Sequence, residues 1–330
     1  MPERRPPAPE PAHSEAPAAV SVVIPTYRRP QRLIACLDGL ARQNRPPDQI
    51  VCVVRDEDAE TQEAVQEWKR RNPQLAQCLT VAVVSQPGQI PAMNAGLAAA
   101  KGDVVAFTDD DCVPRPEWIS RMLAHYADRS VGGVGGRDVI HYGDRIVEGD
   151  VRVVGRYQWF GRPIGNHHLS LIGCRPADVD ILKGANMSFR KKLMRPFDEA
   201  LQMGSAQCND LDMSLHVRRQ GYRLVYDPAV VVDHFPAQRF GESTRDTEAP
   251  HMLYAEGHNW MYVALKHAAW WQVPVVLLYG FLIGHARAYG LGRAAWSVFR
   301  DGPRLALHRL YHSLRGKLGG IMTWLQSGRG

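Results

Sequence analysis

The 330-residue sequence predicts an α/β protein with a mostly parallel β-sheet flanked by helices and a helical extension at the C-terminus. Two observations predict the sheet: apolar strand-like segments alternate with helical segments between residues 20 and 130, and polar residues follow each strand. A third observation predicts the extension, because a long uncharged, aromatic stretch precedes a basic tail. A chain of this length buries enough surface to fold without disulfides or structural metals.

The elements of the first half can be justified in order. An apolar run over residues 20–24 predicts a strand that Pro25 ends, and Pro30 is well placed to begin a helix over 30–42. In that helix Leu33, Leu37 and Leu40 recur at spacings of three and four, which predicts one buried face. The same reading predicts strands at 50–54, 80–84 and 104–108, and helices at 61–71 and 91–100.

Charge and cysteine content exclude several classes of protein. The net charge is +6, but residues 287–330 hold seven Arg and one Lys against one acid, Asp301, so the rest is nearly neutral. This distribution argues against a general nucleic-acid binder. The six cysteines are scattered, without the spacing of a zinc site, and we expect a reducing compartment.

Three predicted strand ends carry polar residues, at 25–28, 55–58 and 109–111. In open α/β sheets, ligands bind beyond the carboxyl ends of the strands. Three consecutive aspartates after a buried strand repel one another, and a bound Mg²⁺ or Mn²⁺ that also bridges substrate phosphates would resolve this. The alternative is a solvated acidic loop in which Asp111 caps a helix near Pro116.

A glycine-rich run, Gly132-Gly133-Val134-Gly135-Gly136, fits neither the dinucleotide-binding fingerprint nor the Walker spacing. We interpret these glycines as relieving crowding at a turn or bulge. The sequence therefore offers no glycine-rich phosphate-binding loop.

A series of motifs follows the chain in order. They are Val22-Val23-Ile24-Pro25-Thr26-Tyr27, Pro91-Ala92-Met93-Asn94-Ala95-Gly96, Asp109-x-Asp111, Lys183-Gly184-Ala185-Asn186-Met187-Ser188-Phe189-Arg190, Asn209-Asp210-Leu211-Asp212, and Asp227-Pro228 leading to Asp233-His234. The ordered set, over residues 21–239, resembles the family 2 glycosyltransferases of the GT-A (Rossmann-like) fold, in their membrane-associated bacterial type.

The resemblance implies roles for individual residues. It implies a nucleotide and donor-sugar site made of Pro25, Thr26, Tyr27, Asp56, Asn94, Asp109, Asp110, Gly184 and Asn186, and a metal site made of Asp111 and His234. Asp56 would contact the base and Asp109 the ribose. Three alternatives stay open: Asp56 as an ordinary loop acid, Asn94 as a satisfied polar helix residue, and His234 as a structural histidine.

The resemblance also implies a catalytic base. Inverting transfer requires a group that takes the proton of the acceptor hydroxyl, and Asp210 occupies the matching position. The family usually has Glu-Asp here, so Asn209 departs from the pattern. Asp210 as a helix N-cap remains the alternative, and Asp212 fits an acid in the first turn of a helix.

The uncharged stretch 268–286 is nineteen residues long and includes Trp270 and Trp271, but Pro274 and several glycines interrupt it. A spanning helix needs about 20 predominantly apolar residues, so we prefer a helix that lies in the membrane interface beside the Arg-rich tail. The alternative is a helical pair packed on the main domain. We expect a cytoplasmic protein that is peripheral at the inner face of the cell membrane.

These inferences combine into one prediction. Residues 1–19 form a disordered lead-in, 20–240 a catalytic domain with a nucleotide-binding half (20–130) and an acceptor and base half (131–240), and 241–330 a helical basic region. The enzyme would transfer a sugar, with Mn²⁺ or Mg²⁺, from a nucleotide-diphosphate donor to a glycan, lipid-linked or small-molecule acceptor. A nucleotidyltransferase of similar fold and a catalytically silent scaffold are the alternatives.

Overall fold

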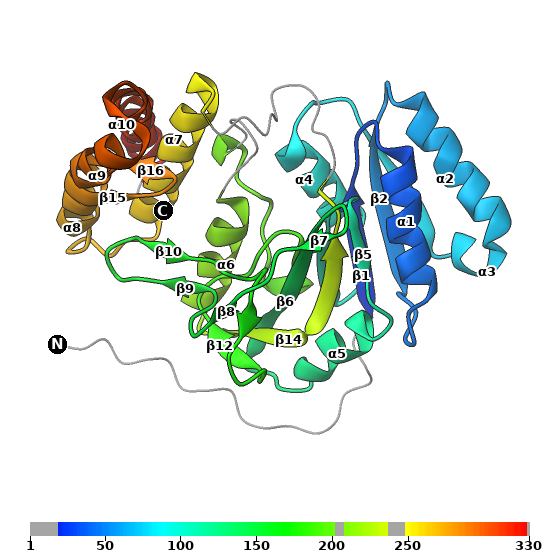
Figure 1. Cartoon of the computed structure of the whole chain (residues 1–330). Helices are drawn as coiled ribbons and strands as arrows, with labels where there is room; N and C mark the ends of the chain where they lie inside the picture. Colours follow the sequence, from blue (N-terminus) through cyan, green and yellow to red (C-terminus); the bar gives the residue numbers. More distant parts are fainter. Residues whose placement is uncertain (1–18, 202–207, 237–247, 329–330) are drawn as a thin grey trace. The chain divides into compact units, whose positions relative to one another are not determined.

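A computed structural model describes residues 19–201, 208–236 and 248–328 (Figure 1). The chain forms two compact units, each assembled from three segments. The first comprises Met1–Arg156, Ile164–Phe197 and Met213–Ala237, and the second comprises Tyr157–Pro163, Asp198–Asp212 and Gln238–Gly330. The chain therefore passes between the two units several times, whereas the sequence analysis placed a single boundary at residue 240. Apart from Ala19, the predicted lead-in lies outside the described residues.

The alternation of strands and helices predicted for the first half is confirmed. The elements are β1 (Val20–Pro25), α1 (Pro30–Ala41), β2 (Gln49–Arg55), α2 (Ala59–Arg71), α3 (Pro73–Ala76), β3 (Leu79–Val84), α4 (Gln89–Ala99) and β4 (Val104–Thr108). Every predicted boundary lies within two residues of the observed one. Only the single turn α3 was not expected, and it begins at Pro73, a residue suited to the first position of a helix.

The rest of the first unit extends the same sheet and adds short strands that pair with one another outside it. It contains β5 (Cys112–Pro114), α5 (Trp118–His125), β6 (Val131–Tyr142), β7 (Arg145–Ile146), β8 (Asp150–Val151), β9 (Arg156–Tyr157), β10 (Pro163–Ile164), β11 (Ser170–Leu171), β12 (Ala177–Val179), β13 (Asn186–Arg190) and β14 (Arg223–His234). The main path of the sheet has the order β12-β14-β6-β13-β4-β1-β2-β3. Strands β4, β1, β2 and β3 pair in parallel, whereas β13 is antiparallel to both its neighbours.

Successive side chains of the central strands point to opposite faces of the sheet, and helices cover both faces. Val22 and Ile24 pack in one core cluster with Leu33 and Leu37 of α1. Val23 points to the other face, where Gly96 of α4 lies so close that an added Cβ would stand 2.3 Å from the Val23 side chain. The sheet is therefore buried on both sides, as its continuous apolar strands require.

The glycine-rich run lies within strand β6 rather than in a turn. Residues 132–136 are buried between β13 and β14, and a Cβ on Gly136 would collide with the carbonyl group of Val230. The register of β14 shifts between Asp227 and Val231, opposite this glycine, which marks a bulge in the partner strand. The glycines of β6 therefore do relieve crowding at a bulge, but the bulge itself lies in the neighbouring strand β14.

The second unit is mainly helical. Its elements are α6 (Asn209–Arg219), whose first turn belongs to this unit, α7 (Pro250–Lys266), α8 (Val273–Leu278), the π-helix η3 (Tyr279–Ile283), β15 (Gly284–His285), β16 (Ala288–Tyr289), α9 (Leu291–Asp301) and α10 (Pro303–Gln326). Helices α7 and α10 pack closely because glycines stand at their contact: Gly316 and Gly320 approach the backbone of α7, and Gly257 approaches that of α10. The Lys317 ammonium is fully buried, and it donates to three backbone carbonyl groups.

The stretch 268–286 does not form one helix. It is divided into α8, η3 and β15, and the break follows Ile283, where Gly284 takes a φ of 72° that favours glycine. Over the described residues, no helix combines the length and apolar character needed to cross a bilayer. The stretch thus contains one helical run, α8 continued by η3 over residues 273–283, with exposed apolar side chains, and its place in a membrane interface stays a prediction.

Candidate active site

The carboxyl ends of β1 and β4 meet at one edge of the sheet because these strands are parallel. Just beyond them, the Thr26 hydroxyl donates a 2.8 Å hydrogen bond to Asp110, and an Arg29 Nη1 donates to the other oxygen of that carboxylate, also at 2.8 Å. Burial raises the pKa of Asp110 to about 6 although Arg29 opposes the shift. Asp110 therefore ties two strand ends together, and its contact with a donor stays a prediction.

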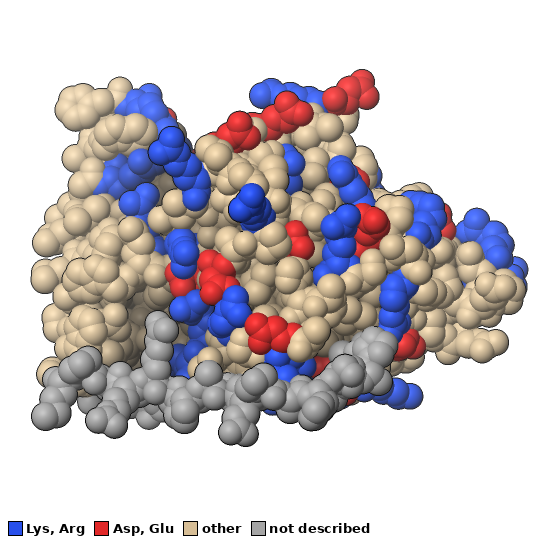
Figure 2. All heavy atoms as spheres, turned by 90° about the horizontal axis from the view of Figure 1, so that it is seen from below, with Lys and Arg blue, Asp and Glu red and all other residues tan. Residues whose placement is uncertain are grey.

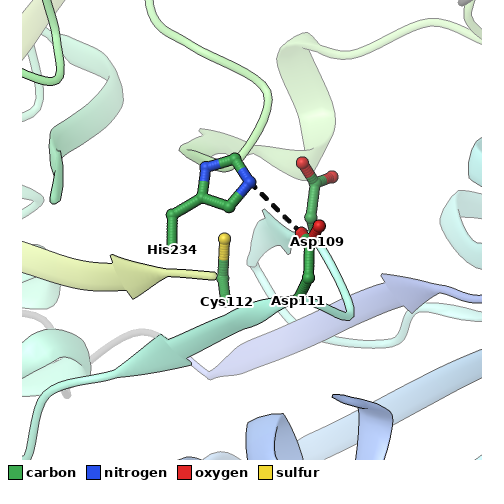
Figure 3. A group of neighbouring side chains, drawn as sticks. All are labelled: Asp109, Asp111, Cys112 and His234. Carbon is green, nitrogen blue, oxygen red and sulfur yellow. Dashed lines mark ion pairs between the residues drawn. The ribbon is translucent and has the colours of Figure 1, made fainter. Parts of the chain in front are cut away.

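The two flanking aspartates belong to a cluster of possible metal ligands (Figure 3). Ligand atoms of Asp109, Asp111, Cys112 and His234 all lie within 4.8 Å of one another. Strand pairing explains how distant parts of the sequence meet here, since β5 runs antiparallel to β14 with Cys112 opposite His234. The Nε2 atom of His234 lies 3.3 Å from Asp111 Oδ1, the pair joined by the dashed line in Figure 3.

The side chains of this cluster differ in their pKa values and so in their ability to bind a metal. Burial alone would lower the pKa of His234, but Asp111 and Asp138 raise it to about 9. Burial raises the pKa of the Cys112 thiol well above its ordinary value, so that this group stays protonated. The donor set is therefore carboxylate oxygens together with an imidazole nitrogen that a bound cation would free of its proton. This set suits Mn²⁺ or Mg²⁺ better than it suits a thiophilic metal.

The residues predicted to contact the nucleotide lie at the ends of β1 and β2. Thr26 N–H donates to Val53 O at 3.0 Å, which fixes the end of β1 beside β2. The Tyr27 hydroxyl donates to Glu57 at 2.7 Å, and the Arg55 guanidinium lies 5.5 Å from the Tyr27 ring centroid. Asp56, half exposed on the following turn, accepts from the Glu57 N–H. An aromatic ring, carboxylates and guanidinium groups thus lie side by side, although their contact with a nucleotide remains a prediction.

The three residues predicted near the donor sugar have different surroundings. Asn94 binds the backbone of Phe197 through both amide atoms, at 2.9 and 2.7 Å. Asn186 is buried and makes three hydrogen bonds: it accepts from Trp118 Nε1 and donates to the carbonyl groups of residues 137 and 230. At Gly184 an added Cβ would meet open space. Both asparagines hold the protein backbone in place, and whether they or Gly184 border a sugar stays a prediction.

The predicted base, Asp210, lies in the first turn of α6. Its backbone N–H donates to the side chain of Asn209, and its carboxylate accepts from the backbone N–H of Leu211, each at 2.8 Å. Asp212, two residues after Asp210 in this turn, pairs with Lys266 and His267 within the second unit. Asp212 is therefore a buried structural acid as well as a helix N-terminal one. The role of Asp210 remains a prediction.

Three charged residues of the site were missed at the level of sequence. Arg29 binds Asp110, while Lys183 and Asp138 form an ion pair close to His234. Lys183 belongs to one of the motifs given above, and Asp138 is an acid that follows a buried apolar run of β6, so each carried a weak signal. Each of these residues pairs with one from a distant part of the chain, which a local sequence pattern does not reveal.

Comparison with known families decides the class. The family model described as "Glycosyltransferase like family 2" matches residues 17–249, which is most of the chain. The chain belongs to this family. The glycosyltransferase predicted from the motifs is thereby confirmed, and the nucleotidyltransferase and silent-scaffold alternatives lose their support.

Among its relatives, this glycosyltransferase is similar to Glycosyltransferase AglE of Haloferax volcanii, with 25% identity over 227 residues and 68% of each chain covered. It is also similar to the Pre-mycofactocin glycosyltransferase of Mycobacterium tuberculosis, with 33% identity over 157 residues. That match covers 44% of this chain and 30% of the relative, so the chain spans less than a third of that protein.

Solved structures confirm the GT-A fold of this glycosyltransferase. The mannosyltransferase PcManGT of Pyrobaculum calidifontis, in complex with GDP-Man and Mn²⁺, has a TM-score of 0.55 at 20% identity, with 99% of this chain and 92% of that chain covered. GalNAc-T7, with UDP, GalNAc and Mn²⁺, has a TM-score of 0.61 at 16% identity, with 96% and 59% covered. The acidic cluster described above agrees with the divalent cation that the sequence predicted.

Proposed function

We propose that this glycosyltransferase takes a sugar from a nucleotide-diphosphate donor and transfers it, with inversion, to a hydroxyl group of a glycan, lipid-linked or small-molecule acceptor. The observation that carries the proposal is the convergence of two aspartates and a histidine at the sheet edge. Two structural neighbours that were solved with nucleotide-linked ligands and Mn²⁺ support it. The Tyr27 ring and the Asp56 carboxylate would bind the nucleotide.

Asp109, Asp111 and His234 would hold the cation, which when bound would neutralise negative charge on the departing diphosphate. Asp210 would accept the proton of the acceptor hydroxyl as its oxygen attacks the anomeric carbon. In that step the new glycosidic bond forms while the bond to the diphosphate breaks, so the anomeric configuration inverts. No protein nucleophile is required.

Calorimetric titration with UDP-, dTDP- and GDP-sugars, with and without Mn²⁺, tests the donor and metal sites. We expect one donor to bind only with the metal, and Asp111→Ala to abolish that binding. Asp128→Asn is the matched control, because this half-exposed acid pairs with Arg223 away from the cluster. If no donor binds the folded wild-type chain under any metal condition, the proposed site is wrong.

A second experiment tests the base and the stereochemistry. Asp210→Asn should bind donor and metal like the wild-type chain but transfer sugar at least about a hundredfold more slowly. NMR of the first product formed should show the opposite anomeric configuration to the donor. Retention of configuration, or full activity of the variant, would refute this part of the proposal.

We further propose that the enzyme works at the inner face of the cell membrane, attached through its second unit. Trp270 and Phe299 are 83% and 92% exposed, and two guanidinium groups lie 4.3 and 4.6 Å from the Trp296 ring centroid. In Figure 2 the left-hand part, where Figure 1 has the second unit, is mostly uncharged with Lys and Arg along its margin. Apolar anchors beside basic groups suit an anionic bilayer surface.

Vesicle sedimentation tests the attachment. The full-length chain should bind vesicles that contain anionic lipid, bind neutral vesicles less, and lose most binding in a Trp270→Ser, Phe299→Ser double variant. Val83→Ser removes an exposed apolar side chain from the first unit and serves as the control. Equal sedimentation of the double variant and the wild-type chain would contradict attachment through this surface.

A further inference from the structure

A buried carboxylate lies on the far side of the His234 imidazole. Asp138, fully buried in β6, pairs in register with Val232 of β14, two residues before His234. The Asp138 Oδ2 atom lies 3.6 Å from His234 Nδ1, while His234 Nε2 lies 3.3 Å from Asp111. The imidazole ring therefore stands between two carboxylates, one on the side of the metal cluster and one within the protein.

Two features fix Asp138 in this position. The Lys183 ammonium forms an ion pair with Oδ2 of Asp138, and the Asp138 backbone N–H donates to the carbonyl group of His167 at 3.2 Å. Among the described residues, neither His234 Nδ1 nor Asp138 Oδ1 has a hydrogen-bond partner.

A histidine that binds a metal through Nε2 must carry its proton on Nδ1, and a carboxylate that accepts this proton sets both the tautomer and the ring orientation. We propose that Asp138, itself held by Lys183, is a positioning residue that aims the Nε2 lone pair of His234 at the metal. This inference rests on the metal site proposed above and adds two residues that no motif assigned to it. Lys183 balances the buried negative charge of Asp138, which would otherwise be costly to keep away from water.

The test compares two buried aspartates of the first unit. Asp227 also binds a histidine, His125, at 2.7 Å, but it lies seven residues before His234 on β14 and outside the metal cluster. Free Mn²⁺ measured by electron paramagnetic resonance gives the affinity of each full-length variant. Asp138→Asn should weaken Mn²⁺ binding about 10- to 100-fold, whereas Asp227→Asn should change it less than about twofold.

The outcomes are distinguishable. If the wild-type chain binds Mn²⁺ and Asp138→Asn binds it equally well, the positioning role of Asp138 is refuted while the proposed metal site stands. If the wild-type chain does not bind Mn²⁺, the metal site fails and the role of Asp138 fails with it. Thermal unfolding of both variants separates metal affinity from stability, because a merely structural role would lower the melting temperature without moving the Mn²⁺ affinity of the folded fraction.

A measurement on the wild-type chain keeps the proposal testable should Asp138→Asn fail to fold. Nitrogen-15 NMR of histidine-labelled protein, with Cd²⁺ as a diamagnetic ion and His234→Gln for assignment, reports which ring nitrogen carries the proton. We expect a proton on Nδ1 and the metal on Nε2. A proton on Nε2 in the loaded protein would overturn the inference.

Discussion

Replacement of Asn186 by alanine should destabilise the first unit strongly. The side chain is 1% exposed, and its loss leaves three buried groups without their partner: the Trp118 indole N–H and the carbonyl groups of Arg137 and Val230. At about 1 kcal/mol for each orphaned group, the loss is about 3 kcal/mol. For a unit of this size, that corresponds to a fall in melting temperature of about 6 to 12 °C.

Thermal unfolding monitored by circular dichroism measures this fall, with calorimetric titration of the donor in parallel. Asn44→Ala is the matched control, since that side chain is exposed and its backbone φ is negative, and we expect a change within about 0.5 kcal/mol. In a double-mutant cycle, Trp118→Phe should couple to Asn186→Ala by about 1 kcal/mol. Unchanged stability of Asn186→Ala together with lost donor binding would refute the structural role assigned to its amide.

Three further predictions concern the rest of the chain. Without metal, the pKa of His234 is about 9, above the ordinary 6.5. Protonation of His234 therefore stabilises the folded state by about 3 kcal/mol, and this contribution is fully present below pH 6.5. It is lost as the pH rises through 9. Urea unfolding in EDTA should show this loss in the wild-type chain and not in His234→Gln. Gly136→Ala should prevent stable folding, because the methyl group would strike the Val230 carbonyl, and soluble yield with circular dichroism checks this. Trp260→Phe removes the buried 2.8 Å hydrogen bond to the carbonyl group of Gly161 and should destabilise the second unit by about 2 kcal/mol in denaturant unfolding.

Local pattern was sufficient for the parallel half of the sheet. The apolar run of β1, the proline that opens α1 and the spacing of Leu33, Leu37 and Leu40 are short-range signals, and the observed elements follow them closely. The segment 268–286 shows the limit of such signals. Its apolar character was clear, but the end of its helical run at Ile283 depends on the backbone conformation at Gly284.

The candidate site was predictable in its acids and less so in its supporting contacts. Asp111 and His234, which the motifs implied as a metal pair, lie close together because strand pairing brings His234 opposite Cys112, and Asp109, which the motifs placed at the ribose, lies beside them. The ion pair of Lys183 with Asp138 depends on two chain segments that only the folded sheet brings together, so no local pattern contains it. For the same reason, the sequence did not show that the Asn186 amide makes its hydrogen bonds to other residues of the first unit.

The second unit is built from three separate segments of the chain, which limits the ways in which such an enzyme can evolve. Trp260, Lys266 and His267 of helix α7 and the residue after it bind Gly161, Asp198 and Asp212, which come from earlier parts of the chain. A gene fragment that encodes only the last ninety or so residues lacks these partners. The unit is therefore not an exchangeable cassette, and new surface properties are accessible through point substitutions on it rather than through recombination of whole modules.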